Sequence, residues 1–498
     1  MKLFTIGLDG ASFELINQFI EEGVLNNFSK LTELGLYYPL NSTVPPHTAP
    51  GWVSSLTGVN PGNHGIYQFW DTQAPNYVGK FMGSNDIQIP FIWKILNKRG
   101  YTTGMINIPM THPPKAVNGY ILTWPLSNTL QYCYPADLIK EIARHQGHYV
   151  SDLVTMYKGD INYINEALDI TRKRFQTIKY LIKNKPVDFL MAVFTEIDRV
   201  SHFYWHFMEN KDCDKFLHNA IRDIYIETDR VLGEILELLD EETILMVYSD
   251  HGFEKGNLEF YVQSYLIQAG FMHLKEVPED YIMKGNWFEY RHDNKKYIVD
   301  WNKTVAYMAA PGSYGVNLNL ERRQKKGIVK RSEYDEVCQK VIEQLKIVKN
   351  PINNKPLFKK VVKKSEIFNG NFTNSAADII LIPENWGIMV HHNITGCELF
   401  SYNPEQTGMH SMNGIFLMYG KKIMNLSHKQ PKDLRDIAPS ILDLFDVPIP
   451  SYMEGRSIFL LQEKKDTNIR LDAVDTRASY SNEEQEEIEE RLKRLGYL

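Results

Sequence analysis

Residues 243–252 read Thr-Ile-Leu-Met-Val-Tyr-Ser-Asp-His-Gly, an apolar run that ends in a carboxylate, an imidazole and a glycine. The apolar run predicts a buried strand. Ligands of parallel α/β sheets gather beyond the carboxyl ends of the strands, and Asp and His side chains carry the oxygen and nitrogen atoms that bind divalent metals. Asp250 and His251 are therefore candidate metal ligands. The alternative is a turn without chemistry, because Asp-His-Gly is also an ordinary turn sequence.

Apolar runs of strand length alternate with helical patterns on both sides of this segment. We expect further strands at 2–8, 102–108, 188–194, 378–382 and 415–419, and helices at 12–22 and 223–239. Strands that alternate with helix-length segments are typical of parallel sheets. The sequence therefore predicts an α/β fold with a doubly wound, mostly parallel sheet flanked by helices.

The composition changes between residues 253 and 374, where Lys, Tyr, Asn and short aromatic runs replace the strand-helix rhythm. This stretch predicts an inserted lobe beside the sheet. The catalytic core then comprises residues 1–252 and 375–460, and residues 461–498 form an exposed arm followed by a helix.

That terminal helix is amphipathic. Ser481 and Glu484 form a capping box, and an apolar face with a glycine stop follows. The face comprises Ile488, Leu492 and Leu495, and the stop is Gly496. We expect the helix to dock on the protein itself or on a second subunit, and the second alternative would make the protein a homo-oligomer.

The composition excludes several classes of function. The chain has 498 residues, 43% of them hydrophobic, and a net charge of −6, which gives no basic footprint for nucleic acid and disfavours an anionic membrane surface. No apolar run approaches the roughly 20 residues of a membrane span, and an acidic residue interrupts the N-terminal apolar run where a signal peptide would continue. The four cysteines form no CxxC pair, which is typical of a reducing compartment. We expect a soluble, cytoplasmic protein.

Other candidate ligands follow other predicted strands. Asp9 follows the first strand, and Asp198 and His202 follow the strand at 188–194 with the i,i+4 spacing that places both on one helix face. His410 precedes the last strand. Each has a simpler alternative: Asp9 could cap the first helix, His202 could pack among its aromatic neighbours, and His410 could be a loop histidine. Three carboxylates and three imidazoles together suffice for two divalent ions.

A candidate nucleophile lies in the segment Pro46-His47-Thr48-Ala49-Pro50-Gly51. A helix that starts near Gly51 would place Thr48 at a helix N-terminus, where backbone N–H groups and the helix dipole favour anions. Metal coordination can activate a threonine hydroxyl. The alternative is that Thr48 only caps the helix.

These motifs resemble the alkaline phosphatase superfamily, in its type I phosphodiesterase and nucleotide pyrophosphatase branch, and are similar to predicted phosphohydrolases and phosphomutases of bacteria and archaea. The motifs occur in family order: Gly7-Leu8-Asp9-Gly10, His47-Thr48-Ala49-Pro50-Gly51-Trp52, Thr57 to Ile66, Glu196-Ile197-Asp198 to His202, Ser249-Asp250-His251-Gly252, Gly408-Met409-His410, Asp436 to Leu442 and Met453-Glu454-Gly455-Arg456. The resemblance spans nearly the whole chain and implies an alkaline-phosphatase-like fold.

The resemblance also implies a metal-dependent phosphoric ester hydrolase with two divalent ions, zinc in the first place and manganese as the alternative. One ion would be held by Asp198, His202 and His410, and the other by Asp9, Asp250, His251 and the Thr48 oxygen. Thr48 would attack phosphorus and form a phosphothreonine, which water then releases. The expected partner is a small-molecule phosphate ester, a nucleotide among the candidates, and neither a nucleic acid nor a membrane.

One position departs from the resemblance. Nucleotide pyrophosphatases place an asparagine shortly after the His64-Gly65-Ile66 motif, where this chain has Phe69, and Gln68 or the inserted lobe could replace it. The sulfatase branch is unlike this chain, because no arginine follows Pro50 at the position that sulfatases require. A phosphomutase of the same superfamily and a catalytically idle metal-binding protein remain as alternatives.

Overall fold

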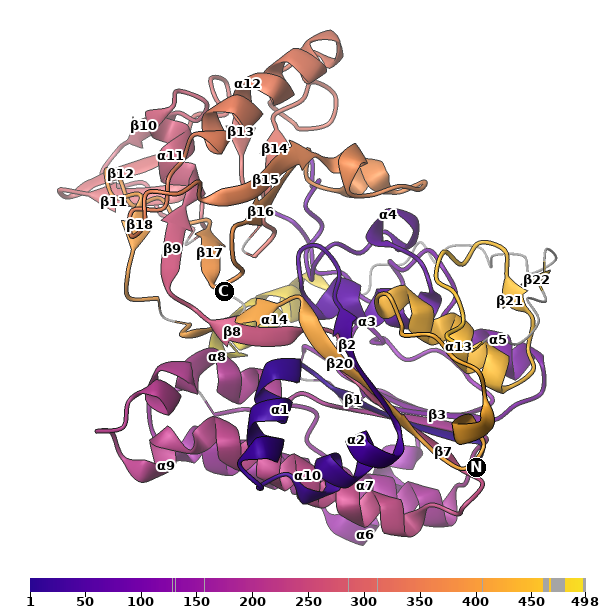
Figure 1. Cartoon of the computed structure of the whole chain (residues 1–498). Helices are drawn as coiled ribbons and strands as arrows, with labels where there is room; N and C mark the ends of the chain where they lie inside the picture. Colours follow the sequence, from indigo (N-terminus) through magenta and orange to yellow (C-terminus); the bar gives the residue numbers. More distant parts are fainter. Residues whose placement is uncertain are drawn as a thin grey trace.

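The computed structural model describes residues 1–495 apart from 128, 130, 156, 285, 311, 405, 460–464 and 467–479. Two parts are visible in Figure 1: a core built around one large sheet, and a lobe of smaller sheets that lies above it in this view. Each part has its own hydrophobic interior.

The core sheet has eight strands in the order β2-β20-β7-β1-β6-β3-β4-β5. The bounds are β1 Leu3–Leu8, β2 Leu36–Asn41, β3 Thr103–Ile108, β4 Gly119–Thr123, β5 Cys133–Tyr134, β6 Phe189–Phe194, β7 Ile244–Tyr248 and β20 Asn413–Tyr419. The five central strands, β7 to β4, are parallel. The pairs β2–β20, β20–β7 and β4–β5 are antiparallel. The predicted mostly parallel α/β sheet is thus confirmed.

The central strands are buried along their whole length. Every residue of β1, β6 and β7 is buried, because helices cover both faces of the sheet. A strand that is covered on both sides contains no alternating polar positions. β6 and β7 therefore appear in the sequence as continuous apolar runs, and β1 has a single polar side chain, Thr5.

Helices lie on both sides of this sheet. In Figure 1 the helices α2, α6, α7 and α10 lie below it, and α3, α5 and α13 lie above it. The helix bounds are α1 Phe13–Glu21, α2 Asn26–Leu34, α3 Thr48–Thr57, α4 Pro61–His64, α5 Ile92–Lys98, α6 Leu138–Gln146, α7 Ile161–Asn184, α8 Glu196–Glu209, α9 Lys215–His218, α10 Ala220–Leu238 and α13 Ile437–Leu444. The predicted helices at 12–22 and 223–239 correspond to α1 and α10.

The lobe consists of three small sheets and two helices. The sheets have the orders β13-β14-β16-β15, β10-β12-β11 and β17-β9-β18. The bounds are β9 Leu258–Tyr261, β10 Leu274–Val277, β11 Glu289–His292, β12 Lys295–Val299, β13 Ala306–Tyr307, β14 Gly315–Leu318, β15 Phe358–Lys363, β16 Ile379–Pro383, β17 Ile388–His391, β18 Phe400–Ser401, α11 Val262–Gln268 and α12 Tyr334–Lys346.

The strand predicted at 378–382 forms as β16, but its expected place in the core sheet is wrong. It pairs with β14 and β15 of the lobe. A short apolar run shows that a strand is buried, but not which sheet it joins. The chain returns to the core only at β19, Gly408–Ser411, which pairs with β8, Gly252–Lys255. We therefore infer that the lobe extends to about residue 404, beyond the limit of 374 expected from composition.

The C-terminal helix α14, Asn482–Leu495, has the predicted capping box. The Glu484 backbone N–H donates to Ser481 Oγ at 3.2 Å, and the Ser481 N–H donates to Glu484 Oε2 at 2.8 Å. Ile488 and Leu492 are buried against the core, so the helix docks on its own chain. The Leu495 side chain, Gly496 and most of the expected arm lie outside the described residues.

Two further expectations concern the whole chain. All four cysteines are thiols without a disulfide. Among the described residues, no helix has the length and hydropathy of a membrane span.

Candidate two-metal centre

The seven candidate side chains come together beyond the carboxyl ends of three adjacent parallel strands. Asp9 follows β1, Asp198 lies in the first turn of α8 after β6, and Asp250 and His251 follow β7. These strands are neighbours in the order β7-β1-β6. Their ligand-bearing ends therefore meet at one edge of the sheet. The ribbon β8–β19 adds His410, and Thr48 begins α3.

The first group of ligands is Asp198, His202 and His410. His410 Nε2 lies 3.1 Å from Asp198 Oδ1 and 3.0 Å from His202 Nε2. His202 Nε2 lies 3.5 Å from the same carboxylate oxygen. The i,i+4 prediction for Asp198 and His202 holds because both lie on α8. His202 also packs edge-on against Phe253, with ring centroids 4.9 Å apart, so aromatic packing and a ligand position coexist there.

The second group is Asp9, Asp250 and His251. His251 Nε2 lies 3.5 Å from Asp9 Oδ1 and 3.3 Å from Asp250 Oδ2, and all three side chains are fully buried. His251 Nε2 is also 3.9 Å from Asp198 Oδ1, so His251 joins the two groups. Asp9 does not cap the first helix, since Ser12 Oγ accepts the Leu15 N–H of α1.

The histidine tautomers follow from backbone carbonyls. The Nδ1 atoms of His202, His251 and His410 lie 3.1–3.2 Å from the carbonyl oxygens of Gly408, Gly252 and Pro46. A carbonyl only accepts hydrogen bonds, so each Nδ1 carries a proton and each Nε2 atom faces the centre. Such hydrogen bonds orient metal-ligating histidines. The Nε2 atoms of His202 and His410 lie 3.0 Å apart, a distance that one shared cation or one shared proton can bridge.

The carboxylates support the same conclusion. Asp9 Oδ1 and Asp250 Oδ2 are buried without a hydrogen-bond donor among the described residues. Burial raises the pKa of Asp9 well above its usual value, and the neighbouring Asp250 and Asp198 charges raise it further. Burial and the Asp198 charge raise the pKa of Asp250 in the same way. Buried carboxylates need a counter-charge, and a divalent cation would supply it.

Asp198 behaves differently. Burial by itself raises its pKa, but His202 and Arg199 together lower it well below the usual value. Burial lowers the pKa of His251 and of His410, so both imidazoles are neutral at pH 7. Neutral imidazoles and an ionised carboxylate are the protonation states that bind metals. The residues present therefore fit two divalent ions.

Thr48 is the first residue of α3, so the helix starts three residues earlier than the expected start at Gly51. The N-cap is His47, whose Nδ1 accepts the Ala49 N–H at 3.1 Å. The alternative in which Thr48 caps the helix is therefore wrong. Thr48 Oγ1 lies 3.4 Å from His251 Nε2, at the positive end of a helix dipole.

Two glycines allow α3 to approach the ligands closely. A Cβ atom on Gly51 would lie 3.0 Å from Asp250 Cβ, and one on Gly7 would lie 2.4 Å from the Trp52 ring. Trp52 in turn donates its indole N–H to Asp9 Oδ2 at 3.3 Å. The small residues beside Asp9 and Thr48 are thus needed for packing.

Other motif residues hold α3 in place. His64 Nδ1 accepts the Ile66 N–H, and His64 Nε2 lies 2.9 Å from Ser54 Oγ on α3. Glu454, from the C-terminal motif, accepts the Asn63 side-chain N–H at 2.6 Å and pairs with Arg435 at 2.8 Å. These residues form a structural support for the helix that carries Thr48.

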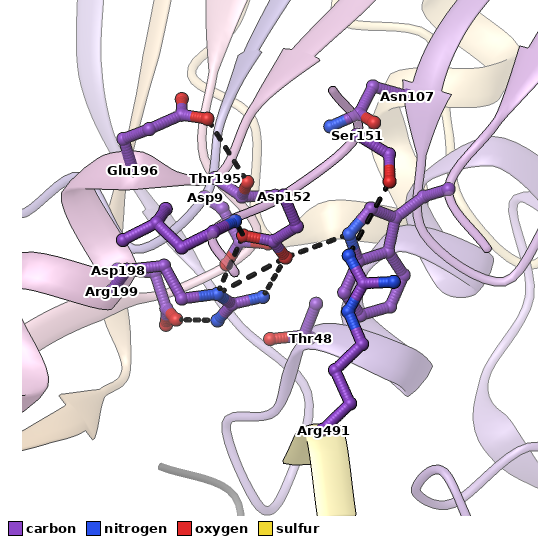
Figure 2. A network of polar contacts seen from close by, with 12 residues as sticks. Asp9, Thr48, Asn107, Ser151, Asp152, Thr195, Glu196, Asp198, Arg199 and Arg491 are labelled. Carbon is purple, nitrogen blue, oxygen red and sulfur yellow. Dashed lines mark hydrogen bonds and ion pairs between the residues drawn. The ribbon is translucent and has the colours of Figure 1, made fainter. Parts of the chain in front are cut away.

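Sequence reasoning missed a set of buried charges next to the centre. Arg199 forms an ion pair with Asp198 Oδ2 (Figure 2). Its Nη2 atom also lies 3.0 Å from Asp152 Oδ2, and all three side chains are fully buried. Trp124 donates to the same Asp152 oxygen at 2.9 Å. The position of Arg199 directly after Asp198 was visible in the sequence, but its burial and its link to residue 152 were not.

Comparison with known proteins agrees with this geometry. The model of the type I phosphodiesterase / nucleotide pyrophosphatase family matches residues 3–413, so the chain belongs to this family of phosphoric ester hydrolases. A comparison with curated proteins gave no match.

Solved structures show the same fold. Phosphonoacetate hydrolase from Sinorhizobium meliloti 1021, in complex with phosphonoformate, is 14% identical with a TM-score of 0.54, over 87% of this chain and 93% of that one. The wild-type alkaline phosphatase PafA is 15% identical with a TM-score of 0.54, over 92% of this chain and 98% of that one. At this identity the likeness concerns the fold.

Proposed function

We propose that the protein hydrolyses a small-molecule phosphate ester with Thr48 as nucleophile and two divalent metal ions. The observation that carries the proposal is the convergence of three imidazole Nε2 atoms and three buried carboxylates, and the Nε2 atom of one of these imidazoles, His251, lies 3.4 Å from the Thr48 hydroxyl. Two of the carboxylate oxygens have no donor among the described residues. Such an arrangement is costly for the fold unless cations bind.

Asp198, His202 and His410 would hold one ion, and Asp9, Asp250, His251 and Thr48 Oγ1 the other. His251 lies near both groups. Mixed imidazole and carboxylate ligands favour zinc, with manganese as the alternative. Bound in this way, two ions neutralise charge on the phosphoryl group and lower the pKa of hydroxyl groups and water.

The reaction would proceed in two displacements at phosphorus. Thr48 releases its hydroxyl proton to solvent and its Oγ1 bonds to phosphorus, while the bond from phosphorus to the ester oxygen breaks and the leaving oxygen takes a proton from solvent to become an alcohol. Water then attacks the phosphorus of the phosphothreonine, the bond from phosphorus to Thr48 Oγ1 breaks, Oγ1 regains a proton and the phosphate product leaves. Thr48 is suited to this role because the N-terminus of α3 stabilises negative charge beside it.

Gln68 is the candidate to bind a phosphate oxygen in place of the absent asparagine. It is 1% exposed, and both atoms of its amide lack a hydrogen-bond partner among the described residues. A buried amide without partners costs about 1–3 kcal/mol, which a ligand would offset. Its neighbour Phe69 packs edge-on against His47, with ring centroids 5.1 Å apart, and this contact brings the segment next to Thr48.

The lobe is the candidate for substrate choice. A cavity of about 960 Å³ lies between core and lobe and is lined by Phe253 and Trp205 from the core and by Lys359, Lys360 and Trp386 from the lobe. The candidate ligands do not line this cavity, but Phe253 contacts both it and the rings of His202 and His410, so one residue separates the cavity from the centre. Lysines beside aromatic rings suit an organic phosphate. Lys360→Ala should change the ranking of substrates and leave the metal content at the wild-type value; an unchanged ranking would contradict a role of this wall.

The test is a panel of phosphomonoesters, phosphodiesters and nucleotides, assayed with zinc and with manganese, together with elemental analysis. Turnover that depends on metal and on Thr48 supports the proposal. Transfer of the phosphoryl group to an added alcohol with little release of phosphate would indicate a phosphomutase. Bound metal without turnover of any ester would indicate an idle metal-binding protein.

A further inference from the structure

The C-terminal helix α14 places an arginine beside the buried charges that support Asp198. Arg491 Nη1 donates to the Pro125 carbonyl oxygen at 3.1 Å, and Arg491 Nη2 donates to Ser151 Oγ at 3.5 Å. Figure 2 shows the Arg491 side chain extending from the helix toward Ser151. The next residue is Asp152, which pairs with Arg199.

The helix α14 does not pack tightly against residues 151–153. A cavity of about 390 Å³, lined by Ser151, Asp152 and Leu153 on one side and by Glu487, Glu490 and Arg491 on the other, lies beneath α14. Arg491 crosses to Ser151 beside this space. Its contact is therefore a specific bridge and not a result of dense packing around it.

The segment that receives Arg491 has no regular secondary structure. Between α6 and α7 it is held by side chains instead: Arg174 donates to the Ser151 carbonyl oxygen at 2.8 Å, and Glu166 accepts the Val154 and Thr155 N–H groups at 2.9 and 2.8 Å. An irregular segment keeps its position only through such contacts. Arg491 is one of these contacts, and it comes from residues far away in the sequence.

The contacts continue to the metal ligands. Asp152 binds Arg199, and Arg199 binds Asp198 Oδ2, which leaves Asp198 Oδ1 directed at His410 and His202. The fully buried groups Asp152, Arg199 and Asp198 carry a net charge of −1, and the Arg491 charge favours the ionised form of Asp152. Removing Arg491 would loosen the residue that orients Arg199.

We propose that Arg491 is a positioning residue for the metal ligand Asp198, acting from the C-terminal helix through Ser151, Asp152 and Arg199. The inference rests on the proposed function, because it assumes that Asp198 binds a metal. Groups that orient a metal ligand directly contribute about 10–100-fold to affinity. Arg491 acts on Asp198 only through Ser151, Asp152 and Arg199, so we expect a smaller effect: Arg491→Ala should weaken metal binding by roughly 3–10-fold.

The experiment measures the dissociation constant of zinc by competition with a chelator, together with the melting temperature in zinc and in chelator, for the full-length protein. Arg491→Ala should bind zinc 3–10-fold more weakly and show a smaller zinc-induced rise in melting temperature. Arg491→Lys, which keeps the charge, should fall between Arg491→Ala and wild type. Asp152→Asn should weaken zinc binding more than Arg491→Ala does.

The matched control is Glu486→Ala, which changes an exposed residue of the same helix. It should leave the zinc affinity at the wild-type value. If Arg491→Ala lowers the melting temperature equally in zinc and in chelator, or leaves the zinc affinity unchanged, the inference is wrong and α14 only stabilises the fold. Failure of the wild-type protein to bind zinc or manganese would instead overturn the proposed function.

Discussion

The core and the lobe each bury a charged cluster, and the two clusters differ in how their carboxylates are paired. In the lobe, Asp378 accepts from both Arg323 Nη atoms at 2.9 and 2.6 Å, from Lys364 at 3.1 Å and from the Tyr334 hydroxyl at 3.1 Å. In the core, Asp9 Oδ1 and Asp250 Oδ2 have no donor among the described residues.

The pKa directions follow this difference. Burial raises the pKa of all three carboxyls, but Arg323 and Lys364 reverse the effect and lower the pKa of Asp378. Within the described residues, no cation reverses it for Asp9 or Asp250, whose pKa values stay raised. The charge of Asp378 is thus neutralised within the lobe. Asp9 and Asp250 lack such neutralisation, which is one reason to propose that they bind cations.

The largest expected effect is that of replacing Thr48, which distinguishes a catalytic role of its hydroxyl from a structural one. Thr48→Ala should lower turnover by roughly a thousandfold or more, about 4 kcal/mol of barrier, while folding and most metal binding are retained. Since His47 caps α3, the loss cannot be ascribed to a missing cap. Steady-state kinetics on the best substrate test this, with Thr48→Ser expected to keep partial activity. Activity of Thr48→Ala within about tenfold of wild type would refute the covalent mechanism.

The lobe cluster should show the opposite behaviour. Asp378→Asn leaves Arg323 and Lys364 without a buried counter-ion, which should lower the free energy of unfolding by about 3–5 kcal/mol. Denaturant unfolding measures this loss, and elemental analysis should find the wild-type metal content. If Asp378→Asn kept its stability but lost its metal, the lobe cluster would be the metal site and its proposed structural role would be wrong.

Metal removal should destabilise the core in particular. A metal at 100 times its dissociation constant stabilises the native state by about 2.7 kcal/mol per site. A strong chelator should therefore lower the melting temperature of the wild-type protein, and zinc or manganese should restore it. Asp378→Asn is the control, since its own melting temperature should fall by a similar amount on chelation. The absence of any shift, together with metal-free protein by elemental analysis, would contradict the two-metal centre.

The smallest effect concerns His64, a buried histidine of the core whose two ring nitrogens both have partners. Burial lowers its pKa to about 3 from 6.5. A base with a lowered pKa stabilises the fold above pH 6.5 and loses this contribution as the pH falls toward 3. Between pH 7.5 and 5.5 the loss is about 1.4 kcal/mol.

His64→Gln, which keeps a side chain able to form hydrogen bonds, should show a correspondingly flatter dependence of unfolding free energy on pH over this range. Urea titrations at the two pH values measure the difference. An identical pH dependence in the variant and the wild-type protein would show that His64 contributes nothing to acid sensitivity.

The sequence by itself determined the class of the core. The apolar runs of β6 and β7 and the nearly apolar run of β1 predicted buried strands, and the polar residues after them indicated where a site would form, since parallel strands end at one edge. The spacing of Asp198 and His202 indicated their common helix face. These are local patterns of period and position, and they do not depend on distant parts of the chain.

Only the tertiary structure decided which groups are paired. The apolar run of β16 looks like a core strand, but it joins the lobe, because sheet membership depends on partners far away in the sequence. The same holds for Arg199 with Asp152, for Arg491 with Ser151, and for the Asp9 and Asp250 oxygens that have no hydrogen-bond donor in the described part of the chain. Whether a buried charge has a partner depends on the three-dimensional packing around it. That packing separates Asp378, which protein cations neutralise, from Asp9 and Asp250, which we propose to bind a metal.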